Sequence, residues 1–572
     1  MSDAPDFDAI VVGSGMSGGW VAKELSEKGL KVLILERGPN IVHGTDYTDM
    51  LQPWEVENHG RVNEDEVARD YAIQSRCYAF DTATKHFWVK DSDHPYLMSP
   101  EKPFYWMRGY HLGGRSLMWG RQTYRWSDID FEANLKDGHG VDWPIRYADI
   151  APWYDYVERF AGISGNAEGL AQLPDGQFQP PMDFSIVEQE VKQKLEAAYP
   201  TRKMTIGRCA HLTKPTDEQT ALGRIICQFR SLCERGCTFG AYFSSLSATL
   251  PAAERTGNLT VQPDSIVHSV IYDPVKKRAS GVRVIDANTK AGRTITARMV
   301  FVNASTISTA ALLLNSKSEV FPSGLANSSD QVGRNLMDHV SGMGASGDYP
   351  GHIDRYYFGR RPNGTYIPRY ANVTEPADDF VRGFGFQGGA LRGSWQRGIW
   401  EPGVGASLKA KLRNPSGWTM HLSGFGEMLP DPNNRVTLDA AQIDKWGVPL
   451  IRIDAAYGPN ELKIAERANQ DAKEMLERAG CVNVNVHKRD DGSPAAPLGY
   501  GIHEMGTARM GRDPKTSVLN EWNQTHDVPN LFVTDGACMA SSACQNPSLT
   551  YMALSARAAN HAVEILKQGV IA

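Results

Sequence analysis

The alternation of apolar and polar positions predicts α/β structure at both ends of the chain and a sheet-rich middle. A buried-strand pattern covers residues 7–12, a helix pattern covers 20–29, and a second strand covers 31–36. Residues 258–286 alternate as antiparallel strands do, and 297–305 is a buried strand that leads into a helix. Long amphipathic helices are predicted at 460–480 and 546–566. The two ends would therefore build one domain, with a sheet-based domain inserted between them.

The turn after the first strand has the sequence of a dinucleotide-binding loop. Gly13, Gly15 and Gly18 follow the G-x-G-x-x-G pattern. The first glycine allows a tight turn, the second lets the backbone approach a pyrophosphate, and the third lets helix and strand pack closely. Glu36 lies 18 residues after Gly18, where a carboxylate can hold ribose hydroxyls. The loop fits FAD or NAD, and its place at the start of a long chain favours FAD.

Composition and charge are those of an ordinary globular protein. Of the 572 residues, 41% are hydrophobic and 22% are charged. The net charge of −6 gives no reason to expect a nucleic-acid partner, and no apolar run reaches the roughly 20 residues of a transmembrane segment. The first residues lack the basic and apolar regions of a signal peptide. A cytoplasmic location is the default expectation, unless a partner's signal exports the chain.

Five stretches in one order along the chain are similar to the glucose-methanol-choline (GMC) family of FAD oxidoreductases. They are GSGMSGG with Glu36, GGRSLMWGRQTYRW, VGRNLMDH, HEMGTARMG, and NLFVTDGACMASSACQNPSLTYMALSARAA. The resemblance implies an α/β fold, in which a Rossmann-type FAD-binding domain carries an inserted sheet-based substrate domain. It assigns 1–45, 105–160, 200–340 and 500–572 to the FAD domain, with a cysteine loop at 224–240. The substrate domain and lid segments would be 46–104, 161–199 and 341–499.

The same resemblance indicates how FAD would be held. Pyranose 2-oxidases of this family attach FAD through a histidine two residues after the serine of GG-x-S. This chain has Met118 at that place, and a thioether cannot form the link, so noncovalent FAD is expected. The expected FAD contacts are Gly13, Gly15, Gly18, Glu36, Arg37, Gly113, Gly114, Ser116, Trp119, Ile266, Ala304, Asp535, Gly536, Asn546, Pro547 and Thr550.

Alcohol oxidation needs a base for the hydroxyl proton and an acceptor for the hydride. His503 of HEMGT matches the family's base, and an imidazole has a pKa suited to this work. Asn546 of NPSLT matches the partner position, where other members have a second histidine. Its amide can both donate and accept, and it can also cap the terminal helix. His339 and His421 are expected to be structural.

Three of the eight cysteines, Cys227, Cys233 and Cys237, lie in one arginine-rich loop. Their C-x5-C-x3-C spacing is neither that of a zinc finger nor that of a bacterial ferredoxin. A disulfide with a free thiol stays possible, although close thiolates beside arginines suit a soft metal. Catalytic subunits of bacterial FAD-dependent glucose dehydrogenases share this spacing, and the resemblance implies a 3Fe-4S cluster. Cys209 is a candidate fourth ligand of a four-iron cluster, and structural cysteines are the alternative.

The overall pattern resembles that of glucoside 3-dehydrogenases and gluconate 2-dehydrogenases. This implies oxidation of a sugar or glucoside at C3, with a c-type cytochrome as electron acceptor. A small subunit with a twin-arginine signal would carry the chain to the periplasm. The alternatives are oxidation at glucose C1 or gluconate C2, a cluster-free pyranose-oxidase-like flavin oxidase, and redox-neutral lyase chemistry. Five tryptophans either stack on sugar rings or belong to the core: Trp54, Trp88, Trp106, Trp395 and Trp400.

Overall fold

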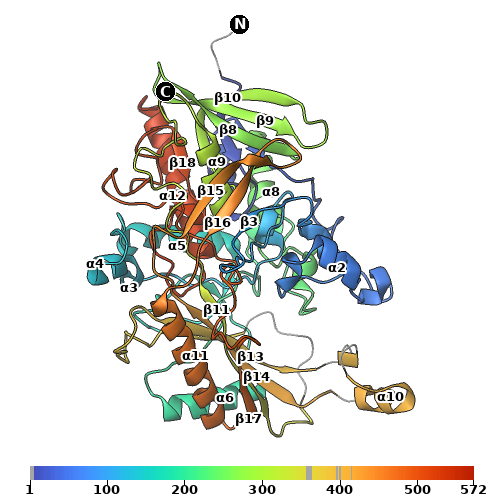
Figure 1. Ribbon diagram of the computed structural model, residues 1–572. Coiled ribbons are helices and arrows are strands. Elements are labelled where there is room, and N and C mark those ends of the chain that lie inside the picture. Colours follow the sequence, from blue (N-terminus) through green and yellow to red (C-terminus); the bar gives the residue numbers. More distant parts are fainter. Residues whose placement is uncertain (1–4, 356–363, 394–396, 399–400, 414, 572) are drawn as a thin grey trace.

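The computed structural model describes residues 5–355, 364–393, 397–398, 401–413 and 415–571. In the view of Figure 1, an upper half is built around a seven-stranded sheet and a lower half around a six-stranded sheet. Both chain termini lie at the top of the upper half (Figure 1). Trp395 and Trp400 lie outside the described residues.

The upper sheet carries the dinucleotide loop. Its strand order is β7-β2-β1-β10-β9-β8, and β18 also pairs with β10. Strands β7, β2, β1, β10 and β18 are parallel, whereas β10, β9 and β8 are antiparallel neighbours. The strands are β1 (Phe7–Val12), β2 (Val32–Leu35), β7 (Leu259–Gln262), β8 (Ser265–Asp273), β9 (Arg278–Asp286), β10 (Gly292–Val302) and β18 (Leu531–Val533).

Both faces of the parallel strands are buried. Ile10 and Val12 of β1 pack into one core, whereas Ala9 and Val11 pack into another. Strands covered on both sides are apolar throughout, and the sequence pattern showed this property. The helices of this half are α1 (Met16–Glu27), α5 (Tyr147–Ala161), α8 (Leu250–Glu254), α9 (Thr306–Asn315) and α12 (Ser548–Lys567).

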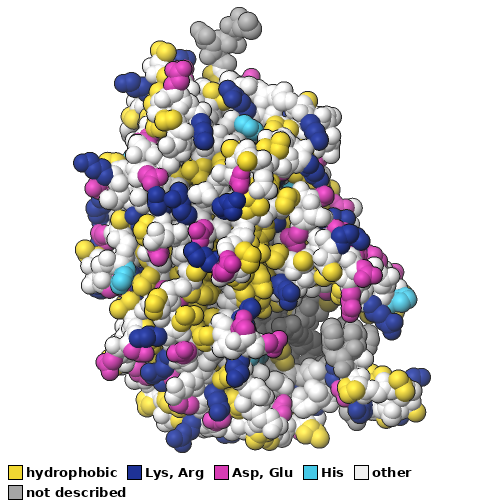
Figure 2. Space-filling view, viewed as in Figure 1, with side chains coloured by type: hydrophobic (Ala, Val, Ile, Leu, Met, Phe, Trp, Pro, Cys, Tyr) yellow, Lys and Arg dark blue, Asp and Glu magenta, His cyan; other side chains and the backbone are white. Residues whose placement is uncertain are grey.

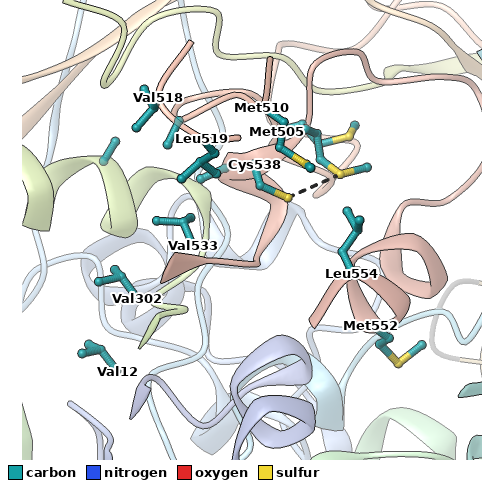
Figure 3. Packing of buried hydrophobic residues seen from close by; sticks show 14 of the residues in the cluster. Val12, Val302, Met505, Met510, Val518, Leu519, Val533, Cys538, Met552 and Leu554 are labelled. Atoms are coloured by element: carbon teal, nitrogen blue, oxygen red, sulfur yellow. Dashed lines mark hydrogen bonds between the residues drawn. The ribbon is translucent and has the colours of Figure 1, made fainter. Parts of the chain in front are cut away.

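A sulfur-rich core lies beside β18 and the segments that follow His503. Met505, Met510 and Cys538 are buried there, and the Cys538 thiol lies 4.0 Å from the Met539 sulfur (Figure 3). Unbranched thioethers fill irregular spaces between segments that do not belong to regular elements. This packing fixes the loop that carries His503 against the end of β18.

The lower half is an antiparallel sheet with the strand order β17-β11-β14-β13-β12-β6. Its strands are β6 (Thr205–Ile206), β11 (Val340–Tyr349), β12 (Thr365–Ile367), β13 (Phe384–Arg392), β14 (Trp418–Gly426) and β17 (Val482–Val486). Helices α6 (Ile186–Ala198) and α11 (Pro459–Arg478) bury apolar side chains against it. Residues of β11, β13 and β14 also line a cavity between the halves.

Two predicted domain boundaries differ from the structure. Residues 205–206, which were expected in the FAD domain, pair with β12 of the lower sheet. Residues 435–454, which were expected in the substrate domain, form a small sheet that adds to the upper half, where the Val436 amide donates to the Gly333 carbonyl at 2.7 Å. Both segments are joined to their sheets by backbone hydrogen bonds across long sequence separations, and a local pattern does not reveal such pairing.

The small sheet has the order β15-β16-β3, and a separate pair is formed by β4 and β5. These strands are β3 (Leu97–Met98), β4 (Ile163–Ser164), β5 (Phe178–Gln179), β15 (Arg435–Ile443) and β16 (Pro449–Asp454). The remaining helices are α2 (Glu64–Asp70), α3 (Asp128–Phe131), α4 (Ala133–Asp137), α7 (Asp217–Ala221) and α10 (Gly405–Arg413). In the described part of the chain, the helices lack the length and hydropathy needed to cross a membrane.

Candidate active site

A cavity of about 1390 Å³ lies between the two halves. Its wall includes the β1–α1 loop, residues of the three strands β11, β13 and β14, and the segment around His503. Trp88 and Trp106 also line it, whereas Trp54 is exposed elsewhere on the surface. The volume is that of a large binding site, which typically holds a ligand that is mostly buried.

The β1–α1 loop forms a cradle for a phosphate group. A Cβ at Gly13 would lie 2.3 Å from the Asn303 carbonyl oxygen, so this position needs glycine. Gly15, in contrast, has its nearest neighbour at 4.0 Å and leaves its face open to the cavity. Within the described structure, no side chain caps helix α1. The first amides of α1 are therefore available to an anion, as a dinucleotide pyrophosphate requires.

Glu36 lies at the end of β2 beside this loop. Its carboxylate accepts hydrogen bonds from the Ser14 amide at 3.1 Å, from the Ser14 hydroxyl at 2.6 Å, and from the Gly38 amide at 3.1 Å. Burial raises the pKa of Glu36. The side chain lines the cavity, which fits the predicted role in holding ribose hydroxyls.

Most of the predicted FAD contacts face the cavity. Those that line it are Gly13, Gly15, Glu36, Arg37, Gly114, Ser116, Trp119, Ile266, Ala304, Asp535, Gly536, Asn546 and Pro547.

The other three predicted contacts do not line the cavity. A Cβ at Gly18 would meet the Gly13 oxygen at 1.9 Å, the Gly113 amide donates to the Ser14 hydroxyl at 2.9 Å, and the Thr550 hydroxyl bonds the Tyr154 hydroxyl at 2.8 Å. Contact of all these residues with FAD stays a prediction.

A chain of hydrogen bonds runs through the predicted catalytic pair. The Gln387 amide donates to Asn546 Oδ1 at 2.6 Å, and Asn546 Nδ2 lies 3.3 Å from His503 Nε2. On the other side, His503 Nδ1 lies 2.9 Å from Nδ1 of His339, whose Nε2 lies 3.2 Å from the Ser542 carbonyl oxygen. The structure thus joins His503 and Asn546, as predicted, and adds two further side chains.

Donors and acceptors can be assigned consistently along this chain of hydrogen bonds. Because the Ser542 carbonyl can only accept, His339 carries its proton on Nε2 and presents the lone pair of Nδ1. His503 then donates its Nδ1 proton to His339 and keeps Nε2 unprotonated. The amide of Asn546 donates to that nitrogen, since its oxygen already accepts from Gln387. The network therefore assigns to His503 the tautomer that a base needs, with the lone pair of Nε2 directed at the Asn546 amide on the cavity side.

The electrostatic surroundings keep both rings neutral. Burial lowers the pKa of His503 well below its usual range, and His339 and Arg115 lower it further. Burial lowers the pKa of His339 to about 4. Both imidazoles are therefore neutral at pH 7, each with one ring proton, and the hydrogen-bond chain requires this state.

Asp338 fixes the backbone around the two histidines. Its carboxyl accepts from the amides of His339 at 2.7 Å, His503 at 2.9 Å and Gly501 at 3.0 Å. Burial, together with the nearby Glu504 carboxylate, raises the pKa of Asp338 to about 7.

Glu504 in turn forms a two-point ion pair with Arg115, at 2.7 and 3.2 Å. His503 itself is held by His339 and Asn546 at its two ring nitrogens and by Asp338 at its backbone amide, which fixes one orientation of the ring.

Replacement of His339 tests the assignment of the tautomer. We expect His339→Ala to lower kcat about 10- to 100-fold, because His503 loses the acceptor that orients its ring. Water in the space left behind would raise the pKa of His503 toward its usual value. Activity needs neutral His503 and is lost as pH falls through that pKa, so the acidic limb of the kcat/KM profile would move to higher pH.

His339→Asn is the matched control, because an amide oxygen can accept at the place of Nδ1. It should retain more activity than His339→Ala and should leave the acidic limb near its wild-type position. Equal losses in the two variants, with an unchanged pH profile, would contradict the positioning role.

Sequence reasoning missed Gln387 and Asp338 and treated His339 as structural. Asp338 and His339 stand in the NLMDH stretch, so a signal was present for them. Gln387 lies within a glycine-rich strand and carries no motif. His421, which was also expected to be structural, lines the cavity.

The three predicted cluster cysteines line a second, small cavity of about 30 Å³. Cys233 lines the large cavity as well, so it separates the two. Each of the eight cysteines, all of which are described, is free of disulfide bonds. Among the described residues, no group of three histidine, cysteine or acidic side chains is arranged to hold a metal ion. Cys209 is buried and does not line the small cavity.

Comparison with known proteins defines the class of this protein. Sequence models of the GMC oxidoreductase family match residues 7–341 and 430–555. The chain therefore belongs to the GMC oxidoreductases, as the motifs predicted. The predicted fold class is confirmed, and membership of the family implies FAD as cofactor, which the cradle and Glu36 fit.

Three individual relatives are similar to this chain over half or more of its length. The chain is 29% identical to a 2-methyl-1,2-propanediol dehydrogenase of Mycolicibacterium austroafricanum, over 98% of this chain and 96% of that one. It is 26% identical to the fructose dehydrogenase large subunit of Gluconobacter japonicus, over 98% of both chains. It is also 26% identical to a C-glycoside 3-oxidase of Microbacterium trichothecenolyticum, over 53% of this chain and 54% of that one.

A solved structure, pyridoxine 4-oxidase from Mesorbium loti, has the same fold. Its TM-score is 0.59 at 16% identity, over 97% of this chain and 98% of that chain.

Proposed function

We propose that this oxidoreductase removes two electrons from a secondary hydroxyl of a sugar or glucoside, at C3, and gives the 3-keto product. The observation that carries the proposal is the hydrogen-bond chain that leaves Nε2 of His503 unprotonated at the cavity wall. When bound, FAD supplies the hydride acceptor. The chain's own residues would then have to bind the alcohol and take its proton.

The geometry of the catalytic pair suits this task. A substrate hydroxyl that enters between the two side chains would donate to His503 Nε2 and accept from Asn546 Nδ2. His503 takes the hydroxyl proton while the carbinol carbon loses its hydride and the C=O bond forms, so that charge and electrons balance. Gln387 keeps the amide of Asn546 turned so that it donates to the substrate oxygen.

The lower wall of the cavity favours a hydroxyl-rich substrate. Gln387, His421 and Ser423 from strands β13 and β14 line it, together with Ser185 and Glu188 near helix α6. Polar side chains of this kind can hold several hydroxyl groups at once. The similarity to a fructose dehydrogenase and a C-glycoside 3-oxidase supports a sugar, and the latter supports C3. Oxidation at C1 or C2 is the alternative.

A small diol is a second candidate substrate, because the chain is similar over nearly its whole length to a 2-methyl-1,2-propanediol dehydrogenase. A screen of sugars, glucosides and short diols with an artificial electron acceptor separates the candidates. We expect turnover with a sugar and a keto group at C3 of the product. Turnover with diols alone would reject the sugar assignment, and rapid peroxide formation without iron would favour the cluster-free oxidase.

We also propose that Cys227, Cys233 and Cys237 hold a 3Fe-4S cluster, which would supply one-electron transfer to an external carrier. Arg121 supports an anionic occupant beside them. Its side chain is buried and lines both cavities, and Nε and one terminal nitrogen find no acceptor within the described residues. Buried guanidinium donors without partners are costly, and a cluster of thiolates and sulfides would provide acceptors.

The backbone of the cysteine loop supports the same proposal. Phe229 and Ser231 have positive φ angles of 56° and 59°, which are unusual for residues with side chains. The Phe229 amide thereby points at the Cys227 sulfur, with nitrogen and sulfur 3.5 Å apart. Amides directed at cysteine sulfurs stabilise thiolate ligands and tune the potential of a cluster.

A one-electron centre near the surface implies a protein acceptor, for which a c-type cytochrome is our proposal. Export to the periplasm together with a signal-bearing small subunit belongs to the same proposal, and similarity to a large subunit supports it. Iron analysis of the purified protein and its electron paramagnetic resonance spectrum test the cluster. Protein that is purified without oxygen and contains no iron would reject it.

A further inference from the structure

Exposed apolar side chains lie on the cysteine loop and on the segment 42–54, part of which packs against that loop. Trp54 is 69% exposed and Met50 56% exposed on the segment before α2, and Ile226 is 44% exposed beside Cys227. Val42, Leu51, Ile225 and Phe229 are also exposed. We name these seven residues the loop patch. Clustered exposed apolar side chains on a soluble protein mark interaction sites, whereas single ones need no explanation.

Polar contacts hold the two segments of the loop patch together. The Asp49 carboxylate forms an ion pair with Arg230, and it also accepts from the Thr238 hydroxyl at 2.7 Å. The Thr48 amide donates to the Arg235 carbonyl at 3.0 Å. The Arg230 guanidinium also lies 3.1 Å from the sulfur of Met50. Residues 48–50 are therefore held directly against the loop that carries the three cysteines.

The rim of the loop patch is acidic. Residues 42–66 hold seven carboxylates and one arginine, a net charge of −6. Lys85 neutralises part of this charge, because it pairs with Glu57 and Glu66. Exposed carboxylates remain at Asp46, Glu55, Glu64 and Asp65, and Figure 2 shows acidic side chains on the side of the molecule that carries α2. Arg230 of the cysteine loop pairs with Asp49, one of the seven carboxylates, and Arg235 pairs with Asp81, so neither arginine offsets the four exposed carboxylates.

We propose that the loop patch is the docking site of an electron-carrier protein whose apolar contact face is ringed by lysine and arginine. The acidic rim would attract such a partner, and Trp54 and Phe229 would provide apolar anchors. A second copy of this acidic chain fits less well, since the two rims would repel each other. The inference rests on the proposed function, because a carrier has a reason to dock here only if electrons leave through the cysteine loop.

A measurement of direct binding to the protein tests the loop patch and does not depend on enzyme turnover. The probe is a lysine-rich c-type cytochrome, titrated calorimetrically at low salt against the wild type and the double variant Trp54→Ser/Glu55→Lys. We expect the variant to bind about tenfold more weakly or worse and to lose most of the salt dependence of binding. The matched control is Val275→Ser/Glu319→Lys, which changes an 89% exposed valine and an exposed acid elsewhere, and it should bind as the wild type does.

The outcomes separate this inference from the proposed function. No binding by the wild type, or equal binding by wild type and Trp54→Ser/Glu55→Lys, would overturn the docking site. Self-association of the wild type that this variant abolishes would instead make the loop patch an interface between copies. Reduction of an artificial dye by sugar should be unchanged in the variant. If no alcohol reduces the dye in any form of the protein while the variant alone loses binding, the proposed function fails and the docking surface stands.

Discussion

His503→Ala is expected to lower kcat by about 10²–10⁴-fold, because the substrate hydroxyl loses the group that takes its proton. In the described structure the hydrogen bonds of the His503 ring go to His339 and Asn546 and not to the β1–α1 loop, so FAD should stay bound. Rapid-mixing measurements of flavin bleaching by substrate would report the lost step directly. The absorbance spectrum of the purified variant would report the retained cofactor.

The control for His503→Ala is His139→Ala, which changes an exposed histidine outside the cavity. It should have wild-type kcat and wild-type flavin content. A His503 variant that keeps both its flavin and its turnover would exclude the imidazole as base. Loss of flavin together with activity would show that the side chain supports the fold of the site and would leave the base unassigned.

Cys233→Ser is expected to separate the two halves of the reaction. Loss of one of three thiolate ligands should cut electron transfer to a cytochrome by at least about 100-fold, since even indirect partners of metal ligands contribute 10- to 100-fold. Flavin reduction by the substrate should continue, because Cys233 lies outside the chain from Gln387 to His339. Dye reduction, cytochrome reduction and iron content, measured on one preparation, distinguish these effects.

Cys481→Ser is the matched control for the cysteine loop. Cys481 is buried against the lower sheet and is likewise free. This variant should retain iron and both activities. Unchanged cytochrome reduction in Cys233→Ser would overturn the role of the loop in electron transfer and would favour structural cysteines.

The nucleotide cradle illustrates what could be predicted from the sequence. Gly13, Gly15, Gly18 and Glu36 lie within 24 residues, and their spacing reflects one turn, one helix and one strand. The strand is apolar throughout because both of its faces are buried. Local geometry of this kind depends on consecutive residues. The structure has β1 and β2 in the predicted places, whereas α1 begins at Met16, four residues before the predicted start.

The surroundings of His503 illustrate what could not. His339 and His503 are 164 positions apart, and Gln387 and Asn546 are 159 apart. A histidine in a motif indicates a base, but the tautomer of His503 depends on which atom faces its Nδ1. Here that atom belongs to His339, whose own proton is directed by the Ser542 carbonyl.

By itself, the sequence determined the family and the nucleotide loop, and it singled out His503 with Asn546 as the proposed catalytic pair and the three cysteines as proposed ligands. The tertiary structure decided the direction of the hydrogen-bond chain, the place of residues 205–206 and 435–454, and the exposure of the apolar side chains around the cysteine loop. The physical reason is the distance along the sequence between the residues that decide each property. Turns and buried strands follow from neighbouring residues, whereas proton positions, strand pairing and surface exposure depend on atoms that meet only when distant segments pack together.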